Sequence, residues 1–527
     1  MMSKNDMKTS RIYKFLAGSI LCLTVLVTAG CNKFLDQAPD DRADLTSLSN
    51  IKELLTAAYP DNSYQLLYDL RSDNSDDKGM RAWSQSQWLR EVYAFQPQCD
   101  NTYQDSPSGY WRALYWATSS ANQALVALDE LEDLSPSEKV VADELRGEAL
   151  VCRAYDGYML AQTFCRPYDP STADQMLGLP YPKTPENELL KQYTRGTLKE
   201  LYDNIKKDFD EGYALIGSNY DQPKYHFTKT SAAAFGSRLY RTLGDWDKVI
   251  EMSRVALGSD PAAKVRDYPR FAKMTWAGSK AAWSLPDEKC NLMVSSCLSN
   301  AHYLCGDSRY SMTVSIFNKE VQPNGGFLGS GLTHGMRQYG GDLYLNFAKH
   351  PEYKQYTNSL KTNWYAYTGF VIFSGEEVLF NLAEAYAMKG DFAKSNDLMQ
   401  IFVARWFTGY SPHSYLYKVD TSKIMDFYEK DSRVFKPFYP LTAEQTCYVK
   451  AITDLRRFAF VQEGLRWLDI RHYNLPVKHK LLHDNDRRTT IHELEPGDPR
   501  YAFQLPSSVL GYELEPNPGY DKSLPID

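Results

Sequence analysis

The sequence predicts a mostly α-helical protein, in which tetratricopeptide-like helix pairs form a scaffold and an irregular insertion adds loops and short strands. Residues 375–407 and 230–261 predict two such pairs, because each has two amphipathic halves separated by a glycine. Residues 262–370 lose the helical period and gather glycines instead. We therefore expect a helical scaffold with one loop-rich segment laid over it.

The stretch of residues 375–407 contains the clearer of the two pairs. Its first half has an apolar face at helical spacing, made of Val378, Leu379, Leu382, Ala383 and Tyr386. Gly390 is expected to end that helix, and Asp391 can cap a second one. The apolar stripe continues there at Phe392, Met399, Phe402 and Trp406. The two helices should fold back on each other as an antiparallel pair.

Residues 230–261 repeat this pattern. When Gly244 is aligned with Gly390, Trp246 falls on Phe392. A unit of roughly 34 residues, with two helices around a small-residue turn, is typical of the tetratricopeptide repeat. Two ordinary amphipathic hairpins remain the alternative, because the match is degenerate. Under the repeat interpretation, Trp246 and Phe392 should be buried at equivalent places.

Length and composition set wide limits. The chain has 527 residues, enough for a large core and for more than one domain by length alone. Its net charge of -7 comes from interspersed acidic and basic residues, so nucleic acid is not an expected partner. Aromatic residues make up 13%, with 38 Tyr and 10 Trp. Such rings either pack between helices or form binding surfaces, and composition leaves both interpretations open.

The N-terminus predicts a lipoprotein signal peptide over residues 1–30. Basic residues precede an apolar run, residues 15–27, that is too short for an ordinary membrane span. Small residues stand directly before Cys31, which indicates cleavage there and a lipid on its thiol. A plain secretory signal is the alternative, because Thr28 stands where Leu is commonest. We expect the protein to be anchored to a membrane and not to span it.

Three regions follow the signal peptide and are expected to form one compact unit. Residues 31–261 contain a polar tether and then helices, whose predicted starts include Ser49 or Ser47 and the pair Ser135-Pro136. This region ends with the first helix pair. Residues 262–370 are the loop-rich insertion and the expected ligand face, since loops on a scaffold usually hold binding groups. Residues 371–527 form the C-terminal region.

No metal or cofactor is expected. The cysteines left after Cys22 and Cys31 contain no C-x-x-C, so structural zinc is not indicated, and disulfide pairing stays open. Residues 69–79 form an acidic loop that suggests calcium. The EF-hand pattern fails, because Ser84 stands at the closing Glu position when Asp73 is first. A solvated turn is the preferred interpretation.

Several stretches resemble the SusD/RagB family of outer-membrane nutrient-binding lipoproteins. ELRGEALVCRAYDGYMLAQTF, GEEVLFNLAEAYAMKGD and DLRRFAFVQEGLRWLDIRHY are each similar to a helix of that family. The last stretch keeps the signature residues Arg456, Arg457, Glu463, Gly464, Arg466, Trp467, Asp469 and Arg471. It departs from the family pattern at Phe458, which stands at a usual Glu.

The resemblance implies a tetratricopeptide-type scaffold anchored at the outer membrane and facing outward. It implies a partner, a SusC-like TonB-dependent β-barrel that the protein would cap. It implies oligosaccharides or other polymer fragments as ligands held for import, and no catalysis. The ligand site is not part of the family signature, so no binding residues carry over. We expect the charged signature residues to hold the scaffold together.

The candidate ligand residues are therefore chosen by chemistry. Sugars present apolar C–H faces and a rim of hydroxyls, so a site needs exposed rings on loops beside polar side chains. Two stretches fit, and they supply Arg81, Trp83 and Trp88 from the first, and Trp276, Trp283, Tyr303, Arg309 and Tyr310 from the second. The alternative is that these rings fill the core beneath long loops. We expect at least one of the four tryptophans to stack on ligand.

Two other functions remain as alternatives. A secreted glycan hydrolase would need two carboxylates at a defined separation, which any acidic chain can offer. The sequence contains no H-E-x-x-H or G-x-S-x-G motif. A peptide-binding member of the same family would instead use the groove of its helix repeats.

Overall fold

Helices dominate the computed structural model, which confirms the predicted fold class. It describes residues 45–82, 86–97, 103–186, 191–218, 220–322, 326–329, 332–341, 343–485 and 487–520. The predicted lipidation site Cys31 lies outside these residues. Within them, no helix is long and apolar enough to cross a membrane.

The helices follow the chain in order. The α-helices are α3 (Leu48–Leu55), α4 (Gln65–Arg71), α5 (Gln87–Tyr93), α6 (Pro107–Glu130), α7 (Pro136–Phe164), α8 (Leu198–Leu215), α9 (Lys229–Leu243), α10 (Trp246–Leu257), α11 (Tyr268–Lys273), α12 (Trp276–Trp283), α13 (Ala301–Asp307), α14 (Val314–Ile316), α15 (Gly375–Met388), α16 (Phe392–Trp406), α17 (Thr421–Tyr428), α18 (Ala443–Ala459), α19 (Leu465–Tyr473) and α20 (Ser507–Leu510). Short 3-10 turns are η1 (Thr56–Ala58), η2 (Gly79–Arg81), η3 (Pro223–Tyr225), η4 (Pro261–Lys264), η6 (Tyr415–Tyr417) and η7 (Pro499–Tyr501), and η5 (Phe317–Val321) is a π-turn.

The strands are short and form three small sheets among the described residues. They are β1 (Asp76–Asp77), β2 (Asn291–Leu298), β3 (Tyr310–Ser311), β4 (Gln338–Gly340), β5 (Leu345–Phe347), β6 (Glu352–Tyr356), β7 (Trp364–Ser374), β8 (Val477–Leu482) and β9 (Arg488–Leu494). The sheet orders are β3-β1-β8-β9, β2-β7-β6 and β4-β5. Strand β6 lies at the edge of its sheet, and all five of its residues are exposed.

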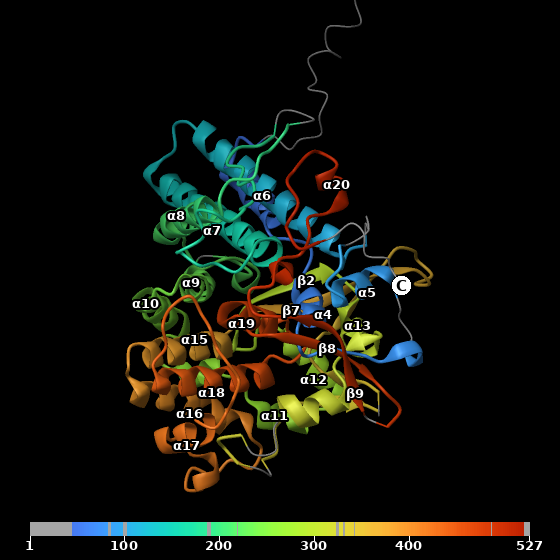
Figure 1. Cartoon of the computed structure of the whole chain (residues 1–527). Coiled ribbons are helices and arrows are strands. Elements are labelled where there is room, and N and C mark those ends of the chain that lie inside the picture. Colours follow the sequence, from blue (N-terminus) through green and yellow to red (C-terminus); the bar gives the residue numbers. More distant parts are fainter. Residues whose placement is uncertain are drawn as a thin grey trace, which may run out of the picture.

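The long helices stack pair upon pair. Helix α7 packs against α6 and α8, α9 packs against α10, and α10 packs against α15, which also contacts α16 and α18. In Figure 1 these helices run down the left side of the molecule, from α6 and α7 at the top to α16 and α17 at the bottom. The strands and α13 lie to the right of this stack. The scaffold therefore presents the strand-containing segments along one side.

The two predicted helix pairs are α9–α10 and α15–α16. Both turn at a glycine in the left-handed region, with φ of 73° at Gly244 and 77° at Gly390. The second helix of each pair is then capped by an aspartate, whose carboxylate accepts from the backbone N–H three residues later at Lys248 and Lys394. The sequence alignment of the two pairs is confirmed by this shared turn.

The expectation that Trp246 and Phe392 are buried was too strong. Both open the second helix of their pair, at equivalent positions, but both are only half-buried. Trp246 packs edge-on against Tyr439 at 5.2 Å between ring centroids, and Phe392 stacks on Tyr448 at 4.5 Å. The residue that opens the second helix of each pair is therefore covered only in part, by one neighbouring ring.

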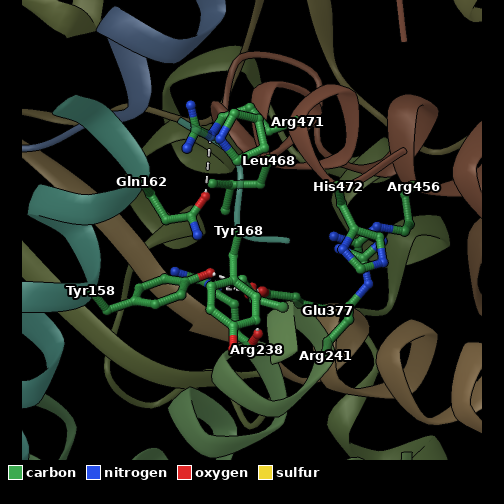
Figure 2. A pocket seen from close by; sticks show the side chains of 12 residues that line it. Tyr158, Gln162, Tyr168, Arg238, Arg241, Glu377, Arg456, Leu468, Arg471 and His472 are labelled. Atoms are coloured by element: carbon green, nitrogen blue, oxygen red, sulfur yellow. Dashed lines mark hydrogen bonds and ion pairs between the residues drawn. The ribbon is translucent and has the colours of Figure 1, made fainter. Parts of the chain in front are cut away.

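Buried ion pairs connect the signature helices α18 and α19 to the repeat scaffold. The Arg456 Nε lies 2.9 Å from Asp469 Oδ2, and Arg241 Nη2 lies 3.1 Å from Asp469 Oδ1. Arg238 of α9 makes a two-pronged ion pair with Glu377 of α15, with both distances 2.6 Å. Figure 2 shows these arginines around a shared interior space. As predicted, the signature residues hold helices together.

The sequence analysis expected the acidic loop to be a solvated turn, and the structure contradicts this. Asp73, Asp76 and Asp77 each pair with an arginine from a distant part of the chain, Arg466, Arg488 and Arg309 respectively. Burial alone would raise the pKa of Asp73, but Arg457 and Arg466 hold it well below its usual range. The loop thereby ties the N-terminal region to the C-terminal one. The described residues contain no cluster of three or more His, Cys, Asp or Glu suited to a metal.

The cysteines of the described part are buried free thiols: Cys152, Cys165, Cys290, Cys297, Cys305 and Cys447. Cys99 lies outside the described residues. The disulfides that the sequence left open therefore do not occur among these six.

Candidate functional site

Helix α13 lies at the centre of the candidate site, and a buried carboxylate holds its first turn. Asp105 Oδ1 accepts a hydrogen bond from the Ser299 hydroxyl at 2.5 Å, and Oδ2 accepts one from the Asn300 backbone N–H at 2.9 Å. Burial raises the pKa of Asp105 to about 6, against the opposing effect of these two donors. The start of the helix is thus fixed by a group whose charge changes in the mildly acidic range.

This arrangement predicts a pH-dependent contribution to stability. The pKa of Asp105 is higher in the folded protein than in the unfolded chain, where it is about 4. Protonated Asp105 therefore stabilises the fold fully below pH 4, and this stabilisation is lost as pH rises through 6. The loss should be about 3 kcal/mol at most. In urea unfolding from pH 4 to 7, the stability of Asp105→Asn relative to the parent should therefore rise with pH. A difference that stays constant over this range would contradict the assignment.

One side of α13 packs closely against strand β5. A Cβ on Gly306 would lie only 2.6 Å from Asn346 Cγ, so glycine permits this approach. The buried ammonium group of Lys78 donates to the Gly306 carbonyl at 2.9 Å. Burial lowers the pKa of Lys78 to about 8, and the nearby Asp307 opposes that shift. The β4–β5 hairpin is therefore fixed beside the end of α13.

Two aromatic rings of that hairpin form a row with a third ring, from α12. The Lys78 Nζ lies 5.7 Å from the centroid of the Tyr344 ring. Tyr339 follows at 6.3 Å from Tyr344, and Trp276 lies 6.0 Å from Tyr339. Tyr339 is 63% exposed, and the other two rings are half-buried. We call Trp276, Tyr339 and Tyr344 the β4–β5 platform.

A second group of rings lies near His302, in the first turn of α13. His302 Nε2 lies 3.7 Å from Glu352 Oε1, and that oxygen lies 3.8 Å from Lys354 Nζ. The same ammonium group sits 4.1 Å from the ring centroid of Trp364, whose partner across the β6–β7 ladder is Tyr356. Trp364 and Tyr356 are 44% and 43% exposed. We call these two rings the hairpin platform.

Tyr303 and Asp307 also belong to α13. They are one helical turn apart, so they share a face of the helix. The Tyr303 ring is 37% exposed and lies 5.1 Å from the ring of His302. Burial raises the pKa of Tyr303, and the carboxylates Asp105 and Asp307 raise it further. These two residues and the two platforms together are called the α13 surface.

Three of the sequence-predicted ligand residues are part of the core. Trp88, Trp283 and Tyr310 are between 2% and 5% exposed. Trp88 stacks on Tyr103 at 5.8 Å, and Tyr310 stacks on Tyr93 at 4.4 Å. The Trp283 ring lies under the Arg266 guanidinium, at 3.8 Å. The expectation of exposed rings at these three positions is therefore wrong, because long loops and neighbouring aromatic residues cover them.

The remaining predicted residues fall into three groups: those bonded within the fold, one outside the described residues, and those on the α13 surface. Arg309 pairs with Asp77, and Arg81 donates to the Leu482 carbonyl and to Asp484, so both guanidinium groups serve the fold. Trp83 lies outside the described residues. Trp276 and Tyr303 are on the α13 surface, where the sequence analysis expected binding groups.

The sequence analysis missed Tyr339, Tyr344, Tyr356 and Trp364. A usable signal was present in residues 352–367, EYKQYTNSLKTNWYAY, where aromatic and polar residues flank a short polar turn. Such a pattern favours a hairpin with side chains on both faces. Treating the whole insertion as irregular concealed that signal.

A hollow lies near α6 and α20. It measures about 380 Å³ and is lined by aromatic and proline side chains, among them Trp111, Tyr115 and Tyr512. It is an alternative place for a ligand.

Comparisons with known proteins agree with this fold. Residues 33–241 match the SusD-like family described as starch-binding and associating with the outer membrane. None of the curated proteins matches the chain. Among solved structures, a SusD superfamily protein from Bacteroides vulgatus has a TM-score of 0.62 at 16% identity, covering 91% of this chain and 99% of that one. A SusD-like carbohydrate binding protein from the same species has a TM-score of 0.59 at 15% identity, covering 91% and 98%.

A third solved structure is the surface glycan-binding protein A from Bacteroides fluxus. Its TM-score is 0.53 at 15% identity, and the match covers 90% of this chain and 100% of that one. All three structures are similar to this chain along nearly their whole length, so the shared fold is complete and does not stop at residue 241.

Proposed function

We propose that this chain is a member of the SusD-like family, whose model matches residues 33–241, and that it captures oligosaccharides at the α13 surface for import across the outer membrane. The observation that supports the proposal most is that each end of α13 adjoins a platform of exposed or half-buried rings, the hairpin platform near His302 and the β4–β5 platform near Gly306. Pyranose rings present apolar C–H faces, and exposed aromatic rings complement them. The family description, starch-binding, is consistent with this ligand class.

The polar groups of the surface suit the hydroxyl rim of a sugar. Asp307 can accept from hydroxyls, and Lys354 can donate to them beside the Trp364 ring. Because the platforms adjoin opposite ends of α13, we propose that they contact different sugar units. The ligand is therefore proposed to be an oligosaccharide with several units, whose middle lies over Tyr303.

Trp276→Ala and Trp364→Ala should each weaken oligosaccharide binding by roughly 5- to 30-fold, about 1–2 kcal/mol, because each removes a stacking ring. The melting temperature should stay close to that of the parent, since neither ring is fully buried. Isothermal titration with a panel of oligosaccharides measures the affinities.

Trp116→Ala is the matched control, because this ring is 70% exposed on α6 and belongs to neither platform. It should bind like the parent. Normal binding by both platform variants, or equal losses in all three variants, would place the ligand elsewhere.

We further propose that the protein is a lipoprotein held at the cell surface through Cys31, and that it caps a SusC-like TonB-dependent transporter. Small residues before Cys31 support the anchor. Cys31→Ala should therefore move the protein from the membrane fraction to the soluble fraction. Retention of that variant on membranes washed with high salt would contradict a lipid anchor.

Binding without catalysis completes the proposal. The residues gathered on the α13 surface are rings and single charges suited to holding a sugar, and Asp307 is the carboxylate at its centre. A peptide ligand is the second candidate within the same family. It would be favoured if the panel of oligosaccharides failed to bind while peptides bound in a manner sensitive to Trp364→Ala.

A further inference from the structure

A small, partly open cavity lies where α7, α9, α15, α18 and α19 meet, and its lining includes none of the residues of the α13 surface. It measures about 20 Å³, which is enough for one water molecule or for a single-atom ion of similar size. Figure 2 shows its lining, in which Tyr168 and Tyr158 lie among arginines that arrive from α9, α18 and α19.

The charges around this cavity do not balance. Four guanidinium groups contribute to its lining: Arg238, Arg241, Arg456 and Arg471. Among the described residues, three carboxylates pair with them: Glu377, Glu384 and Asp469. Burial lowers the pKa of His472, which also lines the space, so its imidazole stays neutral near pH 7. The cluster therefore has an excess of one positive charge.

Arg471 is the arginine that lacks a carboxylate among the described residues. Its Nη1 donates to the Tyr501 carbonyl at 2.6 Å, its Nη2 to the Cys165 carbonyl at 2.9 Å, and its Nε to Gln162 Oε1. These partners are neutral, and the side chain is buried. A buried charge without a counter-charge is costly, so a mobile anion nearby would be stabilising.

Arg238 offers a donor to such an anion. Its Nε and Nη2 are taken by Glu377 and by the Ile372 carbonyl. Its Nη1 is buried and has no hydrogen-bond partner among the described residues. Arg238 is 3% exposed, so bulk solvent cannot satisfy this group. The free donor belongs to a residue that lines the cavity.

We propose that this cavity binds a single chloride ion, which supplies the missing negative charge and accepts from Arg238 Nη1. Water would satisfy the donor but would leave the excess charge in place, so the charge count favours the anion. Bound there, chloride would join the repeat helix α9 to the signature helix α19, and it would contribute to the stability of the scaffold without touching the ligand surface.

Bromide provides the direct test, because it replaces chloride and scatters anomalously. Crystals of the protein grown without chloride and soaked in sodium bromide should show an anomalous peak in the cavity, within hydrogen-bonding distance of Arg238 Nη1. An ordered water molecule with no anomalous signal would overturn the proposal, as would an empty cavity.

A solution measurement tests the same site independently. At constant ionic strength, replacing sodium gluconate with sodium chloride should raise the melting temperature by about 1–2 °C, with saturation. Arg238→Lys keeps a cation beside Glu377 but removes the third nitrogen, so the rise should disappear. Equal melting temperatures of the parent in the two salts would contradict a chloride site even if that variant did not fold.

Discussion

Arg456→Met should lower the free energy of unfolding by about 3–5 kcal/mol, the largest loss we expect from removing a single charge. The Arg456 side chain is 1% exposed, and its Nε lies 3.0 and 2.9 Å from the two oxygens of Asp469. Its Nη1 also donates to Asn381 of α15 at 3.1 Å. Without it, Asp469 would stay buried with only the longer contact to Arg241. Urea unfolding monitored by circular dichroism measures the loss.

Arg433→Met is the matched control for this prediction. Arg433 also grips a carboxylate with two nitrogens, since Nη1 and Nη2 donate to Asp454 at 2.6 and 2.8 Å. Its side chain is 40% exposed, however, and exposed ion pairs contribute only about 0–1 kcal/mol. Equal losses in the free energy of unfolding of the two variants would contradict the claim that burial makes the Arg456–Asp469 ion pair more stabilising than the exposed one.

Trp406→Ala should cost a similar amount, about 3–5 kcal/mol, but through packing. Trp406 ends α16 and is fully buried. Its ring lies 4.1 Å from Tyr268, 4.8 Å from Phe402 and 4.6 Å from Phe458, measured between centroids. Removal would leave a cavity between the rings of Tyr268, Phe402 and Phe458.

Trp246→Ala provides the comparison, because Trp246 is an equally large ring at the rim of the first helix pair. It is half-buried, so its loss should be clearly smaller than that of Trp406. Thermal unfolding of both variants and the parent shows which variant loses more stability. A larger loss for Trp246→Ala would mean that the two helix pairs are not packed as described.

Local signals were enough to predict the scaffold. Gly244 and Gly390 need a left-handed backbone, and the aspartates that follow them cap the next helix, so each pair could be recognised within its own short stretch. The departure at Phe458 is also explained by packing. Its ring lies 4.6 Å from the ring of Trp406 and 5.2 Å from the ring of His334. An aromatic side chain packs against these two rings, whereas the carboxylate of the usual Glu would not.

The candidate site was predictable only in part, because exposure depends on contacts distant in the sequence. Trp88 and Trp364 both stand among polar residues, and nothing local separates them. Trp88 is covered by Tyr103, whereas Trp364 lies on the strand beside the edge strand β6 and keeps 44% of its surface exposed. Tyr339 likewise depends on β4 pairing with β5, and so on the hairpin that places it beside Trp276.

The central claim is that an oligosaccharide lies along α13, and a crystal structure of the protein with a bound oligosaccharide tests it most directly. The account predicts sugar rings against Trp364 on one side and against Tyr339 or Trp276 on the other, with a hydroxyl near Asp307. A sugar bound in the hollow beside Trp111 and Tyr512, with α13 left bare, would contradict it.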